Sequence, residues 1–261
     1  MNNQSIKISA IIKLTLALAL MVLIQNNSWA AQTTGGIQIS LGDNDAATVQ
    51  GGLSSRIIQI LGLITILSIA PALVIMLTSF TRIVIILSIL RNALGLQQTP
   101  PNQVLTGLSL FLTFFIMQST FVKIYDDAIV PLKQNAITEE VAWDKIREPF
   151  HKFMLHNVGE KELNLFKGMA KLDDDIKESD IPMHALIPAF MISEIKRAFE
   201  IGFLLFLPFV IIDIVVASIL MGMGMMMLPP AMITLPIKLI FFVLIDGWYL
   251  LCGSIVRSYG I

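Results

Sequence analysis

The sequence is poor in charge and in cysteine, and each shortage excludes a class of protein. Only 14% of its 261 residues are Asp, Glu, Lys or Arg, against roughly 25% in an average soluble domain. Eighteen Lys or Arg and nineteen Asp or Glu give a net charge of −1, which offers no basic surface for nucleic acid. The single cysteine, Cys252, excludes an intramolecular disulfide, and its apolar surroundings predict a small buried hydrophobic side chain.

Histidines are also few, and neither they nor the acids form a pattern typical of an enzyme. The three histidines lie in the most polar part of the chain, without metal-ligand spacing to a cysteine or glutamate: His151, His156 and His184. Asp213 and Asp246 lie in two apolar segments, as the paired carboxylates of an intramembrane protease would. The Gly-x-Gly-Asp context is absent, however, and Lys238 offers an ordinary electrostatic partner. We therefore expect no catalysis, no metal and no cofactor.

Apolar residues make up 55% of the chain, which is the composition of a membrane protein. Four apolar runs approach the roughly 20 residues that a membrane-spanning helix needs: 57–77, 104–122, 201–221 and 231–252. If all four span the membrane, the loop 78–103 is cytoplasmic. Its only charges, Arg82 and Arg91, agree with the positive-inside rule.

Proline, glycine and ionisable residues interrupt these runs more often than lipid-exposed helices allow. A charge at the bilayer centre costs about 2.5–3.5 kcal/mol on insertion scales, so each needs a protein partner or water. The candidate intramembrane or inter-subunit charges are Glu194, Lys196, Arg197, Glu200, Asp213, Lys238 and Asp246. The simpler interpretation is structural ion pairing between subunits, with Glu194 and Lys238 the first candidates to neutralise each other, and the alternative is a proton relay. Either predicts a chain that assembles with copies of itself or with other subunits.

The N-terminus has the pattern of a secretory signal peptide. Lys7 and Lys13 precede an apolar stretch of about a dozen residues, and Ser28-Trp29-Ala30 supplies small residues at the two positions that a signal peptidase reads. We expect cleavage after Ala30. A short first membrane helix is the alternative, but the apolar stretch is shorter than a span requires.

The predicted fold class is all-α: an integral membrane protein of broken helical hairpins with a small helical periplasmic domain. The expected divisions are a signal peptide (1–30), a flexible periplasmic leader (31–52), a first pair of helical hairpins (53–122), the periplasmic domain (123–184) and a second helical hairpin (185–261).

The domain 123–184 holds nine Lys or Arg and thirteen Asp or Glu, a net charge of −4. Within it, Thr138 predicts a capped helix start. Apolar residues at helical spacing follow at Trp143, Ile146, Phe150, Phe153 and Met154, and again at Leu163, Phe166 and Met169.

The stretch MGMGMMMLPP, residues 221–230, is the most unusual feature of the second hairpin. Its methionines are Met221, Met223, Met225, Met226 and Met227. Methionine fills irregular gaps in a core, which is the simpler interpretation. The stretch also contains residues expected to loosen or end a helix: Gly222, Gly224, Pro229 and Pro230. Non-helical backbone at membrane depth lies against protein or water, so a ring of such loops is a second interpretation, a constriction that blocks ions.

Long stretches of the chain resemble the FliP family of flagellar export-gate proteins, whose counterpart in virulence type III secretion systems is the SctR family. The resemblance rests on PAFMISEI continued by KRAFEIGFLLFLPFVIIDIVVASILMGMGMMMLPP, on LTSFTRIVIILSILRNALGLQQTPPNQVLTGLSLFLTFFIM and on LPIKLIFFVLIDGW. It covers roughly residues 53–261.

The resemblance implies a pore-forming subunit of the export gate in the bacterial inner membrane and periplasm, at the flagellar basal body. It implies a ring of five copies with FliQ-like and FliR-like subunits, within a wider export apparatus that admits unfolded flagellar proteins. The methionines of 221–227 would close the pore, and Glu194 and Lys238 would bridge neighbouring copies. The family assembly lies largely above the membrane plane, so the four apolar runs need not all cross lipid.

A different class of function remains open on the residues alone. A subunit of a small-ion or solute transporter would use intramembrane carboxylates as coupling acids, and Asp213 and Glu200 are the candidates.

Overall fold

The computed structural model describes residues 60–62, 64–65, 68, 75–173, 176–225 and 229–260. The expected cleavage site at Ala30, the leader 31–52 and two of the five methionines, Met226 and Met227, lie outside these residues. The chain divides into two compact units, Met1–Val74 and Ile75–Ile261. The described residues of the first unit are helical, and everything below concerns the second unit.

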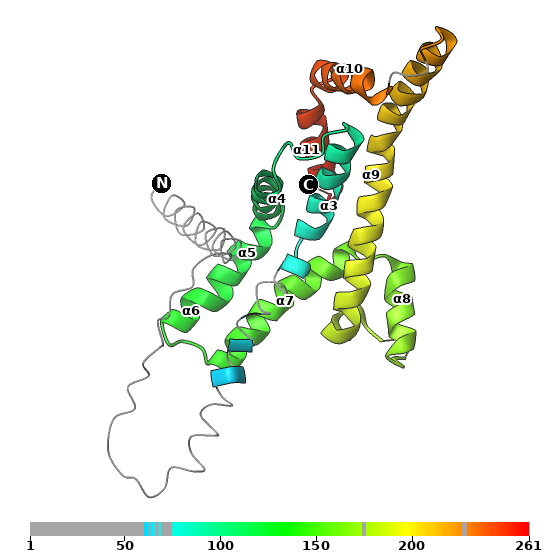
Figure 1. Ribbon diagram of the computed structural model, residues 1–261. Helices are drawn as coiled ribbons and strands as arrows, with labels where there is room; N and C mark the ends of the chain where they lie inside the picture. Colours follow the sequence, from blue (N-terminus) through cyan, green and yellow to red (C-terminus); the bar gives the residue numbers. More distant parts are fainter. Residues whose placement is uncertain are drawn as a thin grey trace, which may run out of the picture. The chain divides into compact units, whose positions relative to one another are not determined.

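Every regular element among the described residues of the second unit is a helix (Figure 1). The α-helices are α3 (Phe80–Ala93), α4 (Asn102–Ile116), α5 (Gln118–Ile124), α6 (Val130–Lys133), α7 (Glu139–Asn157), α8 (Glu160–Met169), α9 (Met183–Gly222), α10 (Ala231–Leu244) and α11 (Gly247–Arg257). A π-helix, η1 (Tyr125–Ile129), joins α5 to α6, and a short 3-10 turn, η2 (Glu178–Asp180), precedes α9. The chain is therefore an all-α membrane protein, as the sequence predicts.

Helix α9 is the longest element, with 40 residues, or about 60 Å at 1.5 Å per residue. In the sequence, the charges of Glu194 to Glu200 separate the apolar run 201–221 from the residues before it. The structure shows one continuous helix through them, with Pro188 and Pro208 inside it. Glu, Lys and Arg are good helix formers, so charges that interrupt an apolar run do not interrupt the helix.

Helix α3 forms the centre of the core, lying alongside α9 (Figure 1). Its residues Ile83, Ile86, Leu87 and Leu90 are at most 1% exposed, and their spacing of three and four positions places them on one face. Each such side chain contributes about 1.5–3 kcal/mol when fully buried. The expected loop 78–103 is helical over Phe80–Ala93, because its apolar residues are too few to span a membrane but enough for a buried helix.

Among the described residues, one helix is long and apolar enough to cross a membrane, and this helix is α9. Two further candidates are bent pairs, α4 with α5–α6 at 66° and α10 with α11 at 65°. The predicted continuous run 231–252 is therefore broken. The break is at Asp246, whose φ is +51°, followed by Gly247, where a Cβ would meet the Phe242 ring at 2.2 Å. Only glycine allows this close approach.

The charged domain 123–184 contains the helices α7 and α8. Helix α7 begins directly after Thr138, as predicted, although the Thr138 side chain makes no capping hydrogen bond. Met154 is fully buried in a second core cluster with Leu186 and Phe190, whereas Trp143 is 71% exposed. The predicted apolar face is thus buried only in the second half of α7.

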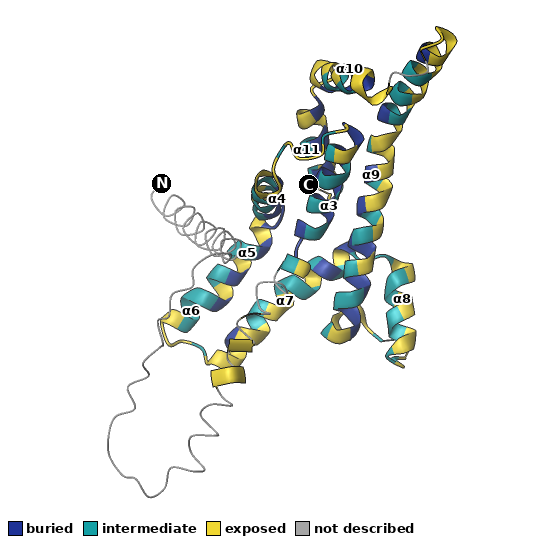
Figure 2. Cartoon of the chain, in the orientation of Figure 1, coloured by how far each residue is buried: buried dark blue, intermediate teal, exposed yellow. Residues whose placement is uncertain are grey.

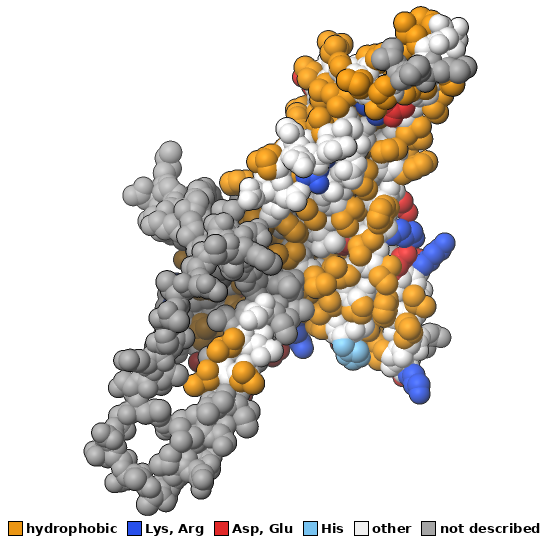
Figure 3. All heavy atoms as spheres, viewed as in Figure 1, with side chains coloured by type: hydrophobic (Ala, Val, Ile, Leu, Met, Phe, Trp, Pro, Cys, Tyr) orange, Lys and Arg blue, Asp and Glu red, His pale blue; other side chains and the backbone are white. Residues whose placement is uncertain are grey.

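Exposed apolar side chains predominate on the second half of α9 and on α10 (Figures 2 and 3). They include Phe203, Leu204, Ile211, Ile214, Ile240, Val243 and Leu244, each at least 60% exposed. A surface of this size and composition is covered by lipid or by other protein.

Candidate functional site

The methionine stretch begins where α9 ends, and the backbone there forms a Schellman motif. The amide of Gly224 donates to the carbonyl of Met221 at 3.1 Å, and the amide of Met225 donates to that of Leu220 at 3.0 Å. Gly224 has a φ of +76°, the left-handed conformation that this helix ending requires. The helix therefore stops at a position fixed by hydrogen bonds.

The four residues expected to break the helix have separate roles. Gly222 is the last residue of α9, and Gly224 makes the left-handed turn. The prolines do not end α9, contrary to the prediction, because it has already ended before them. They lead into α10, with Pro230 at the N-cap position, where a missing N–H costs no helical hydrogen bond.

Three of the five methionines lie among the described residues, and the side chains of all three are exposed. Met221 and Met223 are each 59% exposed and Met225 is 48% exposed. They occupy the end of α9 that is farthest from α8 in Figure 1. Within this chain these three side chains do not fill a core, so the simpler interpretation fails for them.

Lys238 on α10 joins three helices. Its Nζ donates to Oδ2 of Asp213 on α9 at 2.6 Å and to the carbonyl of Ala93, the last residue of α3, at 3.1 Å. The Lys238 side chain is 8% exposed and that of Asp213 is 45% exposed. Lys238 is thus the electrostatic partner of Asp213 that the sequence suggests.

A second charged cluster lies wholly inside the chain. Arg82 on α3 donates from Nε to Oε2 of Glu194 at 2.9 Å, and from Nη2 to Oε1, with both side chains 0% exposed. Arg82 Nη1 donates to the hydroxyl oxygen of Ser258 at 3.0 Å. The Tyr259 hydroxyl donates to Oε2 of Glu194 at 2.5 Å, and its ring lies 3.8 Å from Cζ of the guanidinium group.

Within the chain, Glu194 and Lys238 bind other partners, and their expected pairing between neighbouring subunits stays a prediction. Glu194 binds Arg82, 112 positions away, and Lys238 binds Asp213. Neither Arg82 nor Tyr259 is predicted from the sequence as a partner of Glu194. The signal in the sequence is Arg82 itself. It directly precedes an apolar run, so its charge would need a counter-ion if the segment were buried.

The remaining predicted charges are on or near the surface. Lys196 pairs with Glu162 of α8 at 2.9 Å, and the hydrogen bond from Lys196 holds the pKa of Glu162 below its usual range. Arg197 is half-buried, and Glu200 and Asp246 are exposed. The structure does not bring these residues together into one site.

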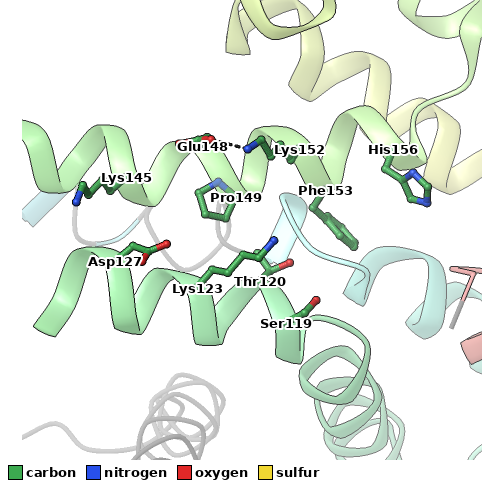
Figure 4. A pocket seen from close by; sticks show the side chains of 10 residues that line it. All are labelled: Ser119, Thr120, Lys123, Asp127, Lys145, Glu148, Pro149, Lys152, Phe153 and His156. Carbon is green, nitrogen blue, oxygen red and sulfur yellow. Dashed lines mark hydrogen bonds and ion pairs between the residues drawn. The ribbon is translucent and has the colours of Figure 1, made fainter.

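A cavity of about 610 Å³ lies between α5, η1 and α7, and Figure 4 shows the side chains that line it. Lys123, Lys145 and Lys152 line it together with Asp127 and Glu148, and Lys152 donates to Glu148 at 2.5 Å. Opposite charges share this cavity, so it has no strong preference for a ligand of either sign.

His156 lines the same cavity, while Nε2 of His151 lies 2.8 Å from the carbonyl oxygen of Ile181. No group of three or more His, Cys, Asp or Glu side chains is arranged to hold a metal ion within the described part of the chain.

The comparisons with known proteins agree on one family. Residues 63–255 match the model of the FliP family. The chain is 50% identical to the flagellar biosynthetic protein FliP of Caulobacter vibrioides over 230 residues, which cover 88% of this chain and 84% of the relative. It is 52% identical to the flagellar biosynthetic protein FliP of Bacillus subtilis over 205 residues, which cover 78% and 93%.

The flagellar biosynthetic protein FliP of Agrobacterium fabrum is 50% identical over 213 residues, which cover 81% of this chain and 87% of the relative. Membership also confirms the expectation that the chain is not an enzyme. The chain belongs to the FliP family.

Proposed function

We propose that this chain is a pore-forming subunit of the flagellar protein export gate in the bacterial inner membrane. Its substrates would be unfolded flagellar proteins. The family membership supports the flagellar role, since the relatives are named for flagellar biosynthesis. The observation that carries the pore role is the exposed position of Met221, Met223 and Met225 at the hydrogen-bonded end of α9.

The physical basis of the seal is the softness of methionine. Its side chain is unbranched, has three rotatable bonds and is polarizable, so it can adapt to a changing partner. Loops from several copies around a common axis would form a narrow apolar constriction, which excludes ions by dewetting. A polypeptide could pass by displacing the side chains, which would then close behind it.

The assembly would contain five copies of the chain with FliQ-like and FliR-like subunits, at the periplasmic side of the inner membrane in the flagellar basal body. The support in the structure is the exposed apolar surface of α9 and α10, which a single chain leaves uncovered. Glu194 and Lys238 already have partners within the chain, so a bridge between copies through them would require an exchange of partners.

The transporter alternative has less support. A coupling carboxylate must take up and release a proton or ion during the cycle. Asp213 instead forms a 2.6 Å ion pair with Lys238, whose Nζ also donates to the carbonyl of Ala93 on α3. These contacts connect α9, α10 and α3, which favours a structural role for Asp213. Asp213→Asn should therefore affect assembly more than transport.

The test is the ion permeability of vesicles that contain the purified gate complex. Replacing Met225, Met226 and Met227 with alanine should make the vesicles leak small ions, while the complex keeps its size in gel filtration. Met169→Ala is the matched control, because Met169 is 70% exposed but lies on α8. Tight vesicles containing a fully assembled triple variant would contradict the seal.

A further inference from the structure

The cavity between α5, η1 and α7 is lined by side chains that the proposed gate does not use. Its volume of about 610 Å³ is in the range of small-ligand sites, roughly 300–1,000 Å³. Thr120, Lys123 and Asp127 lie on the wall formed by α5 and η1, and α7 forms the other wall (Figure 4). Lys145 and Glu148 lie on α7. One concave surface thus holds ammonium groups, carboxylates and a hydroxyl.

The charges of the cavity neutralise one another only in part. Lys152 donates to Glu148 at 2.5 Å, and this bond, with a smaller contribution from Lys123, holds the pKa of Glu148 below its usual range. Lys123, Lys145 and Asp127 form no ion pair or side-chain hydrogen bond with any residue that the structure describes. Two ammonium groups and one carboxylate are therefore available to a ligand.

Thr120 adds a buried hydroxyl without a partner. The residue is 8% exposed, and its side chain makes no hydrogen bond within the described part of the chain. On α4, by contrast, the hydroxyls of Ser109 and Thr113 each donate to the carbonyl four residues earlier at 2.7 Å. Burying a hydroxyl without a hydrogen bond is unfavourable, so a ligand with an acceptor oxygen would gain by binding beside Thr120.

The surface next to the cavity is apolar. Phe111 and Phe115 on α4 are 77% and 59% exposed. Ser119 and Lys123 continue the same four-residue spacing on α5, and both are exposed. Helix α4 and the segment α5–α6 together are apolar and long enough to cross a membrane, with a bend of 66° between them. A change from exposed phenylalanine to exposed lysine at this bend is typical of the boundary between acyl chains and lipid headgroups.

These features select among ligands. A simple anion would meet the lysines but also the two carboxylates, which repel it. A headgroup that carries both a phosphodiester and an ammonium group satisfies both signs. Its phosphate oxygens can accept from lysine and from a hydroxyl, and its ammonium group can donate to a carboxylate. Acyl chains attached to it would cover the exposed phenylalanines of α4.

We propose that this cavity binds the headgroup of a zwitterionic phospholipid of the phosphatidylethanolamine class, with its acyl chains against Phe111 and Phe115. Lys123 and Thr120 bind the phosphate, and Asp127 binds the ammonium group. The site is independent of the proposed gate, because none of these residues belongs to α9, α10 or the methionine stretch.

Lipid retention by the purified complex tests the site, and native mass spectrometry counts the retained lipids. The probes are dioleoyl phosphatidylethanolamine, dioleoyl phosphatidylglycerol, which lacks the ammonium group, and soluble phosphoethanolamine, which lacks the acyl chains. The complex should retain phosphatidylethanolamine in preference to phosphatidylglycerol and should not retain the soluble headgroup.

Two charge variants separate the two halves of the headgroup. Lys123→Gln should weaken the retention of both lipids by about threefold to tenfold. Asp127→Asn should weaken the retention of phosphatidylethanolamine alone and strengthen that of phosphatidylglycerol, a reversal that a merely structural residue would not produce. Lys133→Gln is the matched control, since Lys133 is exposed on α6 but does not line the cavity, and it should change neither.

Thr120→Val is the variant that should preserve the fold, because the hydroxyl that it removes has no partner among the described residues. It should weaken the retention of both lipids without lowering the thermal stability of the delipidated complex.

Equal retention of the two lipids by the unaltered complex, or undiminished retention in Lys123→Gln and Thr120→Val, would overturn the proposal. Retention of soluble phosphoethanolamine as tight as that of the lipid would also overturn it and assign the cavity to a soluble ligand. If the charge variants fail to assemble and Thr120→Val retains lipid normally, the cavity is a contact between copies and the lipid site is wrong.

Discussion

At the scale of single residues, the buried pair of Arg82 and Glu194 shows how this chain tolerates charge in an apolar core. The carboxylate accepts from two guanidinium nitrogens and from the Tyr259 hydroxyl, so the cost of removing both charges from water is offset by several directed bonds. The same bonds fix Ser258 and Tyr259, near the end of the chain, onto α3 and α9.

Arg82→Met should therefore destabilise the protein by about 3–5 kcal/mol, because it leaves Glu194 buried without a counter-ion. Tyr259→Phe removes one hydrogen bond and should cost about 1–2 kcal/mol. Thermal unfolding of the purified complex measures both. Arg147→Met is the control, since its pair with Asp144 is 64% and 76% exposed, and it should have almost no effect. Equal losses for the buried and exposed arginines would refute the account of the core.

The ion pair between Lys196 and Glu162 predicts a dependence on pH. The pKa of Glu162 is lowered in the folded chain, first by the hydrogen bond from Lys196. A depressed carboxyl pKa contributes stability above its unfolded value, and this contribution disappears as the pH falls through the folded value. The docking of α8 on α9 should thus weaken in acid, on the acidic side of the usual glutamate range.

Hydrogen exchange of α8 at neutral and acid pH measures this effect. Glu162→Gln should reduce the difference between the two conditions. Glu160→Gln, on the same helix but without an ion pair to any residue that the structure describes, should preserve it. An undiminished acid effect in Glu162→Gln would assign the pH dependence to another group.

At the scale of secondary-structure elements, the end of α9 depends on one backbone conformation. Gly222 and Gly224 both have open space where a Cβ would lie, so sterics with neighbours do not distinguish them. Gly224 alone has a positive φ, +76°. The same substitution at the two positions therefore isolates the effect of the left-handed turn.

Gly224→Ala should destabilise the turn by about 1–2 kcal/mol, the cost of an L-residue in the left-handed region. Gly222→Ala should be neutral or stabilise the helix by up to about 1 kcal/mol. Hydrogen exchange at the Met225 amide, which donates to Leu220, reports the turn directly. Faster exchange in both variants, or in neither, would contradict the assigned ending of the helix.

The sequence predicts the elements better than it predicts their ends and partners. Helical periodicity and Thr138 indicate α7, and the glycines indicate the end of α9, because these signals are local. The continuity of α9 and the break at Asp246 are missed. Charges interrupt the apolar pattern of α9 but not its helix, and the break depends on the close approach of Gly247 to Phe242. Arg82 and Glu194 are 112 positions apart, so only the folded chain identifies them as a pair.

At the scale of the whole molecule, a single chain leaves many large apolar side chains exposed. The longest helix among the described residues, α9, exposes a row of apolar side chains, and Met221, Met223 and Met225 at its end are 59%, 59% and 48% exposed. Lipid would cover the sides of α9 and α10. The proposed seal at the end of α9 would require the methionine stretch 221–227 of other copies. The proposed ring would explain the exposed methionines and the exposed apolar faces together.

An electron cryomicroscopy structure of the purified complex would test the central claim most directly, by locating residues 221–227 relative to the symmetry axis. The account predicts that the thioether side chains of successive copies converge on that axis and close the conduit. If the methionines instead face lipid or the outer surface of the complex, the proposed seal is wrong.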